Sequence, residues 1–127
     1  MTDITKKKLS LDNDGQINAL SLSLLKASFY PNGQFVDANN LFLYSLQLII
    51  KDTKEKRVFD IIKGGDTPDF KANWKDILSG NPNENKFQFN TGVGDEKQLY
   101  GSFTAVKDIY GDVVKVVFLG YTIKNNL

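Results

Sequence analysis

Three strand-like runs lie near the C-terminal end, and the first two alternate apolar and polar residues with the period of two that is typical of β-strands. They cover residues 86–91, 98–106 and 113–122. In the first run, Phe87 and Phe89 point to one face and polar residues point to the other. Compact turns that contain glycine and aspartate separate the three runs. The pattern therefore predicts three antiparallel strands joined by hairpins.

The last of these runs differs from the others because it is apolar on both faces. Such a pattern is typical of a central strand that is covered on both sides. Helices of the same domain would cover one side, and an N-terminal helix or a second copy of the chain would cover the other. In the middle run, the small residues Gly101 and Ala105 share one face with larger apolar residues. They leave room above the sheet for a helix or a ligand.

A further hairpin is predicted over residues 26–30 and 34–37. Between them, Pro31–Gly33 places a proline of fixed φ ahead of residues that tolerate positive φ. Asn39 follows the second strand directly, and its short polar side chain is suited to cap the helix that carries Phe42.

Two amphipathic helices are predicted. The first covers residues 15–25 and is too short to be stable alone, so it packs either on its own sheet or on a second copy of the chain. The second begins at Thr67 and Pro68 and ends at Gly80. Its buried face has helical spacing and consists of Phe70, Trp74, Ile77 and Leu78.

The segment between residues 45 and 69 has weaker patterns. Residues 51–57 are polar and charged, which predicts a surface loop or an exposed helical turn. The apolar residues of 58–62 return to the core. Gly64-Gly65 is interpreted as a helix stop and turn, because the lysine and the strand-turn-helix context of a phosphate-binding loop are missing.

Several motifs stand in a fixed order along the chain: Ala38-Asn39 after the second strand, Trp74-x-x-Ile77-x-x-Gly80 at a helix end, Asp108-x-x-Gly111 before the last strand, and Thr122-Ile123-Lys124 at its end. In this order they resemble a PAS domain, the small sensory module of bacterial signalling proteins. That family closes with Asp-Ile-Thr, of which this chain keeps only the isoleucine.

The resemblance implies an α+β fold in which a five-stranded antiparallel sheet carries helices on one face. The PAS domain would cover residues 24–124, with a short tail over 125–127. Asp3-Ile4-Thr5 resembles the closing triplet of a different PAS domain. Residues 1–23 would then be the end of a preceding domain and a linker helix, and the chain would be a piece of a tandem-PAS bacterial signalling protein.

The composition of the chain excludes several classes of binding and catalytic site. The net charge is +1 and acidic and basic residues are interspersed, so the sequence lacks the clustered positive charge that is typical of nucleic-acid-binding proteins. No apolar run is long enough for a membrane span or a signal peptide, so we expect a soluble, cytoplasmic domain without membrane contact. The absence of His and Cys excludes a Ser-His-Asp triad, a Cys-His pair and a thiolate zinc site. Within the resemblance, it also excludes cysteinyl-flavin chemistry and haem held by histidine; free flavin or another cofactor stays open, and the cofactor is unknown.

Two functions follow. The first is a sensory input domain that binds a small ligand between sheet and helices and relays a conformational change to an output domain, expected to be a histidine kinase of a two-component system. The alternative is a ligand-free dimerisation or interaction module; the parent then could equally be a chemoreceptor or a cyclic-dinucleotide enzyme. The pocket candidates also fit ordinary core positions: Phe42, Trp74, Phe89, Tyr100 and Phe103.

A homodimer is expected through the N-terminal helix and the sheet face, because PAS domains commonly dimerise in that way. We expect no enzymatic activity of the domain itself, since the strand positions that face inward are apolar or hydroxylic. A buried carboxylate at Asp37 or Asp60 would favour an enzyme instead.

Overall fold

The computed structural model describes residues 24–123, which form five strands and four helices. The strands are β1 (Leu25–Phe29), β2 (Phe35–Ala38), β3 (Asn83–Asn90), β4 (Glu96–Lys107) and β5 (Val113–Thr122). The helices are α2 (Asn40–Ser45), α3 (Ile50–Thr53), α4 (Val58–Ile61) and α5 (Pro68–Leu78).

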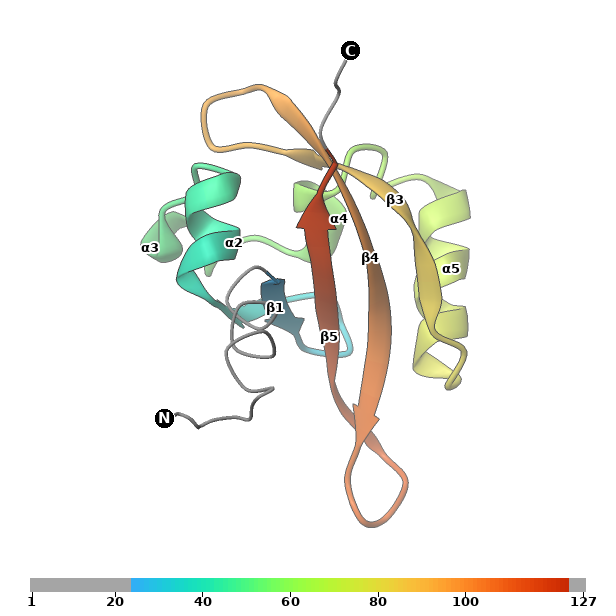
Figure 1. The fold of residues 1–127 in the computed structure, drawn as a ribbon. Coiled ribbons are helices and arrows are strands. Elements are labelled where there is room, and N and C mark those ends of the chain that lie inside the picture. The colour runs from blue at the N-terminus through green and yellow to red at the C-terminus, as the bar shows by residue number, and fades with distance from the viewer. Residues whose placement is uncertain (1–23, 124–127) are drawn as a thin grey trace, which may run out of the picture.

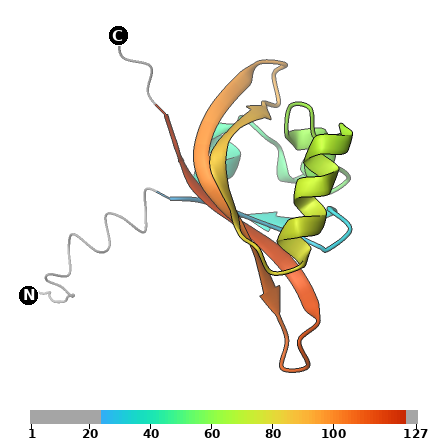
Figure 2. The same ribbon diagram turned by 90° about the vertical axis from the view of Figure 1, so that its right-hand side faces the viewer.

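The strands form one sheet in the order β2-β1-β5-β4-β3, and every neighbouring pair is antiparallel. The last strand of the chain therefore lies at the centre of the sheet (Figure 1). Figure 2 shows that the sheet is strongly curved and that the helices lie on its concave side. The predicted α+β fold, with a five-stranded antiparallel sheet and helices on one face, is confirmed.

The helix predicted over residues 15–25 lies almost wholly outside the described residues. Its last two residues are described: Leu24 lies in no helix or strand, and Leu25 begins β1 and pairs with Gly120 of β5. The helix prediction is wrong at this position. Leu25 is buried in the core, and pairing with the central strand decides its conformation where the local apolar spacing did not.

The two longer helices, α2 and α5, begin at the N-cap residues that the sequence predicts, Asn39 and Thr67. The Asn39 side chain accepts a hydrogen bond from the backbone N–H of Phe42 at 2.9 Å, and the Thr67 hydroxyl accepts one from Phe70 at 3.3 Å. Pro68 occupies the first turn of α5, and Gly80, with φ of 106°, follows the end of that helix. Local sequence alone therefore fixes where these helices begin and where α5 ends.

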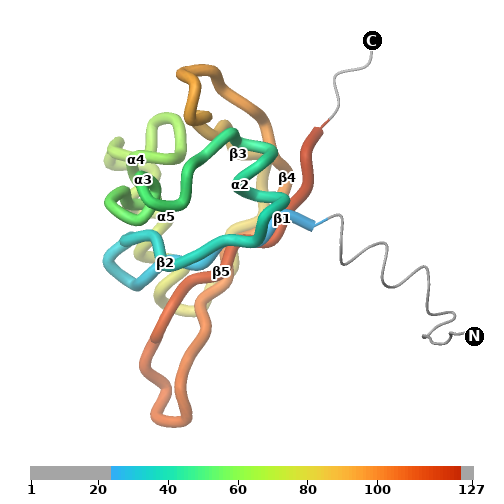
Figure 3. The backbone as a smooth tube through the Cα atoms, turned by 90° about the vertical axis from the view of Figure 1, so that its left-hand side faces the viewer, coloured from blue at the N-terminus to red at the C-terminus, as the bar shows by residue number. Residues whose placement is uncertain are grey.

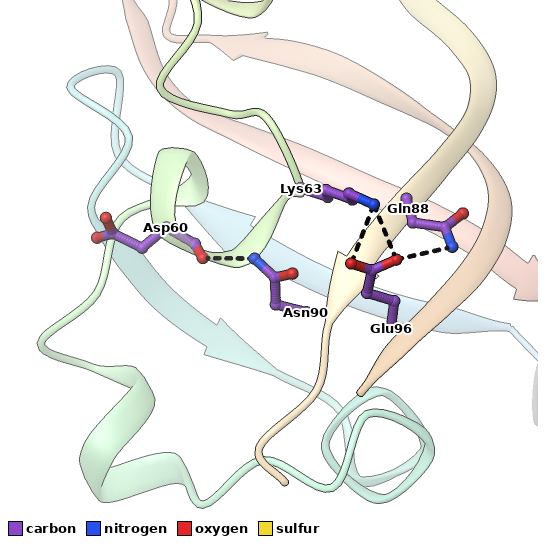
Figure 4. A network of polar contacts seen from close by, with 5 residues as sticks. All are labelled: Asp60, Lys63, Gln88, Asn90 and Glu96. Carbon is purple, nitrogen blue, oxygen red and sulfur yellow. Dashed lines mark hydrogen bonds and ion pairs between the residues drawn. The ribbon is translucent and has the colours of Figure 1, made fainter. Parts of the chain in front are cut away.

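The edge strand β3 is accompanied by the residues that follow α4 (Figure 4). The Lys63 backbone N–H donates to the Gln88 carbonyl at 2.8 Å, and the Lys63 ammonium lies 3.1 Å from the Glu96 carboxylate. The Asn90 amide donates to the Asp60 carbonyl oxygen at 3.2 Å. The exposed ion pair contributes little stability by itself, about 0–1 kcal/mol. The contacts together cover an edge that would otherwise be open to another strand.

The hairpin of β4 and β5 projects beyond the rest of the domain (Figure 3). Gly111 in its turn has φ of 88°, and a Cβ atom added there would meet nothing within 4 Å. Any cost of a substitution at Gly111 is therefore a cost of backbone conformation and not of packing.

We expect Gly111→Val to lower the free energy of unfolding by about 1–2 kcal/mol, because valine strongly disfavours positive φ. Urea denaturation would measure the change. Gly111→Asn is the matched control and should cost less, since asparagine tolerates this region. Equal stability of the valine variant and the wild type would show that the turn adopts another conformation in solution.

Candidate functional site

Four of the five predicted pocket residues meet in the interior between sheet and helices. Phe42 comes from α2, Trp74 from α5, Phe89 from β3 and Phe103 from β4. All four side chains are at most 4% exposed. The ring centroids of Phe42 and Phe89 are 5.9 Å apart, and those of Trp74 and Phe103 are also 5.9 Å apart. The sequence thus identified residues that do lie together.

Phe118 of the central strand joins the two pairs. Its ring centroid lies 5.2 Å from that of Phe89, 4.9 Å from that of Phe103 and 6.3 Å from that of Phe42. These distances are typical of aromatic rings in direct contact. The rings therefore fill the volume that a ligand between sheet and helices would require.

The space above Gly101 is also filled. Gly101 and Gly120 are paired across β4 and β5, and a Cβ atom on either one would lie 2.7 Å from the Phe118 ring. The small residue does make room above the sheet, as expected, but the room holds a side chain from the neighbouring strand. Local patterns did not single out Phe118, because its partners come together only when β5 pairs with β4.

Tyr100 does not lie with the other four candidates, which corrects the expected pocket. It is on the outer face of the sheet, where its hydroxyl donates to a Glu84 carboxylate oxygen at 3.0 Å and its ring lies 5.6 Å from that of Tyr121. The hydrogen bond to Glu84 and the charge of that carboxylate raise the pKa of Tyr100. The alternation along β4 already predicts that Tyr100 faces away from the interior, since successive side chains of a strand point to opposite faces and Tyr100 is an odd number of positions from Phe103.

The outer face of the sheet is a second candidate site. Leu119 and Tyr121 of β5 are 44% and 50% exposed, and Tyr100 on β4 lies beside Tyr121. No helix or strand among residues 24–123 covers this face, because all the described helices lie on the other side (Figure 2). These exposed side chains on the central strand make the outer face a candidate contact surface.

A polar groove of about 640 Å³ is a third candidate. It lies among α3, α4 and the turn between β3 and β4, outside the aromatic interior. Its walls include the carboxylates of Asp52, Glu55 and Asp60. Sequence patterns do not predict this groove, because its walls come from segments that are far apart along the chain.

The carboxylates that an enzymatic pocket would require to be buried are not buried. Asp37 and Asp60 are both exposed. Within residues 24–123, no group of acidic side chains is arranged to hold a metal ion, and no helix is long and apolar enough to cross a membrane.

The architecture matches many solved structures. One is a domain of a sensory box sensor histidine kinase/response regulator from Geobacter sulfurreducens, with a TM-score of 0.68, 16% identity, and 84% of this chain and 93% of that chain covered. A PAS domain from a two-component sensor histidine kinase matches with a TM-score of 0.64 and 14% identity, over 86% of this chain and 96% of the other. The chain has the PAS fold.

Other PAS structures from different biological settings also match. The PAS domain of the fruit-fly ELK potassium channel has a TM-score of 0.63 and 14% identity, with 87% of this chain and 97% of that chain covered. No protein-family model and no curated protein matches this sequence. The PAS assignment therefore rests on the fold, and the low identities leave the function to be argued from the residues of this chain.

Proposed function

We propose that this PAS domain is a cytoplasmic signal-input module of a larger bacterial protein, such as a sensor histidine kinase, and that it acts through protein contacts and not through a ligand in its interior. The module would span residues 24–124, with residues 1–23 as the incoming linker. Solved structures of the same fold from two histidine kinases and a channel support a role in signalling. Fold alone does not select a function, so the choice between contact and ligand depends on the site.

The observation that carries this proposal is the filled interior. Phe103 alone has aromatic neighbours on four other elements, with centroid distances from 4.9 to 6.4 Å. A ligand in this volume would have to displace rings that are already in contact. Displacing buried phenylalanine rings costs several kcal/mol for each ring, which a small ligand would have to offset.

The partner in this proposal is a second copy of the chain, bound at the outer face of the sheet. Leu119 and Tyr121 would lie at the centre of the contact. A second copy presents the same apolar residues, so a two-fold arrangement buries both sets at once. Tyr100 and Glu84 would remain hydrogen-bonded beside them at the rim.

The double substitution Leu119→Asp and Tyr121→Asp is expected to convert a dimer into a monomer, because it places two charges in the apolar contact. Sedimentation velocity would measure the change. Ile109→Asp with Tyr110→Asp is the matched control: these residues are 91% and 82% exposed at the hairpin tip, and the control should remain dimeric. A wild-type monomer, or a dimer in the sheet-face variant, would contradict the proposal.

A second candidate, the ligand sensor, is favoured by the polar groove and not by the interior. Its volume of about 640 Å³ is within the range of small-molecule sites, and its walls hold three carboxylates and one ammonium group, that of Lys56, which suits a small polar molecule with a net positive charge. Native mass spectrometry of the purified protein separates the two functions. We expect a dimer of bare chains, whereas a non-covalent adduct would make the sensor the primary function.

A further inference from the structure

A basic groove lies between α4 and α5, away from the outer face of the sheet. It has a volume of about 490 Å³. Its floor is formed by the half-buried ring of Phe59 and the buried ring of Trp74, and exposed basic side chains stand at its rim. The lining residues are Arg57, Phe59, Pro68, Lys71, Ala72, Trp74 and Lys75.

The aromatic floor of the basic groove is held in place from behind. The ring of Phe59 lies 6.0 Å from that of Phe70 and 5.8 Å from that of Trp74. It also packs on Gly33, where a Cβ atom would come within 2.7 Å of the ring. The Trp74 indole N–H donates to the Pro31 carbonyl at 2.8 Å. A partner would therefore meet a surface that is already ordered, which lowers the entropic cost of binding.

The rim of the basic groove is positively charged. The Arg57 guanidinium lies 5.5 Å from the centre of the Phe59 ring, and the Lys71 ammonium lies 5.8 Å from it. Both distances are within the range of a cation–π interaction, which keeps the two charges beside the floor. Lys75 adds a third cation, and none of the residues that line the groove is acidic.

The charge of this groove contrasts with that of the rest of the domain. The chain as a whole has a net charge of only +1, and the walls of the polar groove beside α3 contain three carboxylates and one lysine, Lys56. Three cations around an apolar floor are therefore a local concentration of positive charge. Such a surface attracts acidic partners during encounter and orients them when they bind.

We propose that the basic groove binds an acidic peptide segment of a partner protein that inserts one apolar side chain onto the Phe59 floor. The carboxylates of the segment would pair with Arg57, Lys71 and Lys75. Arginine is well suited to this role because its planar guanidinium binds a carboxylate through two parallel hydrogen bonds. The groove is on a different surface from the proposed dimer contact, and neither proposal depends on the other.

Fluorescence anisotropy with a fluorescein-labelled synthetic peptide tests this proposal. The probe is a peptide of four glutamates around one phenylalanine, in low-salt buffer. We expect binding that weakens when phenylalanine is replaced by serine and when salt is added, since charge and anchor both contribute. A dissociation constant weaker than about 1 mM, or equal binding of the peptide without its anchor, would overturn the proposal.

Variants of the protein test whether the peptide binds at the basic groove. Arg57→Gln with Lys71→Gln should weaken binding by about tenfold, since two exposed charge contacts are lost. Lys26→Gln with Lys86→Gln removes the same charge from exposed positions on the outer face of the sheet and should leave binding unchanged. Ala72→Glu is a second variant, which adds a negative charge to the groove without altering the aromatic floor, and it should weaken binding as well. Equal weakening in the control pair would show attraction to net charge alone and would overturn the proposed site.

Discussion

Trp74→Ala is expected to lower the free energy of unfolding by about 3–5 kcal/mol, among the largest effects of any single substitution in this domain. The indole is 4% exposed, and it contacts rings on three sides. Its removal leaves a cavity among Phe29, Phe59 and Phe103, and the Pro31 carbonyl loses the 2.8 Å hydrogen bond from the indole N–H. Urea denaturation monitored by circular dichroism would measure the loss.

Trp74→Phe is the matched control, because it keeps an aromatic ring and removes only the indole N–H and part of the volume. We expect a smaller loss of about 1–3 kcal/mol, which corresponds to the unpaired Pro31 carbonyl and the smaller ring. An unchanged melting temperature of Trp74→Ala would refute the burial of this side chain. Equal losses in the two variants would show that the hydrogen bond, and not packing, accounts for the effect.

Phe118→Ala should produce a comparable loss of about 3–5 kcal/mol. The ring is fully buried and lies over the paired glycines Gly101 and Gly120. Neither glycine has a side chain that can fill the space when the ring is removed. The site therefore collapses poorly, and poor collapse is the condition under which the cost of a cavity is greatest.

Leu119→Ala is the control for Phe118→Ala, since it truncates the next residue of the same strand on the opposite face. Its side chain is 44% exposed in the described structure, so we expect a loss well below that of Phe118→Ala. A reversed order of the two losses would show that the faces of β5 are exchanged, because a shift of one residue in register exchanges the two faces.

Local patterns predicted most of the elements for identifiable reasons. The cap of α2 at Asn39, the start of α5 at Thr67 and its end near Gly80 each depend on a few neighbouring residues, so short sequence patterns specify them. The bounds of β5 were predicted at Val113 and Thr122 for the same reason. By contrast, β3 begins at Asn83 and not at Lys86, because pairing with β4 extends it through polar residues.

The candidate pocket was predicted less well than the fold. Phe42, Trp74, Phe89 and Phe103 lie together in the interior, since each has the parity or spacing of an inward-facing residue. Sequence alone did not show whether they surround a ligand or contact one another. The ring of Phe118 decides this, and its position over Gly101 follows only from the register of β5 against β4.

By itself, the sequence determined the start of α2, both ends of α5, the bounds of β5 and which faces of the strands are apolar, because these properties depend on neighbours within a few positions. Tertiary structure decided three further features: a filled interior, the outer-face position of Tyr100 beside Glu84, and the basic groove around Phe59. Each joins residues that are far apart along the chain. Their contacts depend on strand order and packing, which local patterns do not encode.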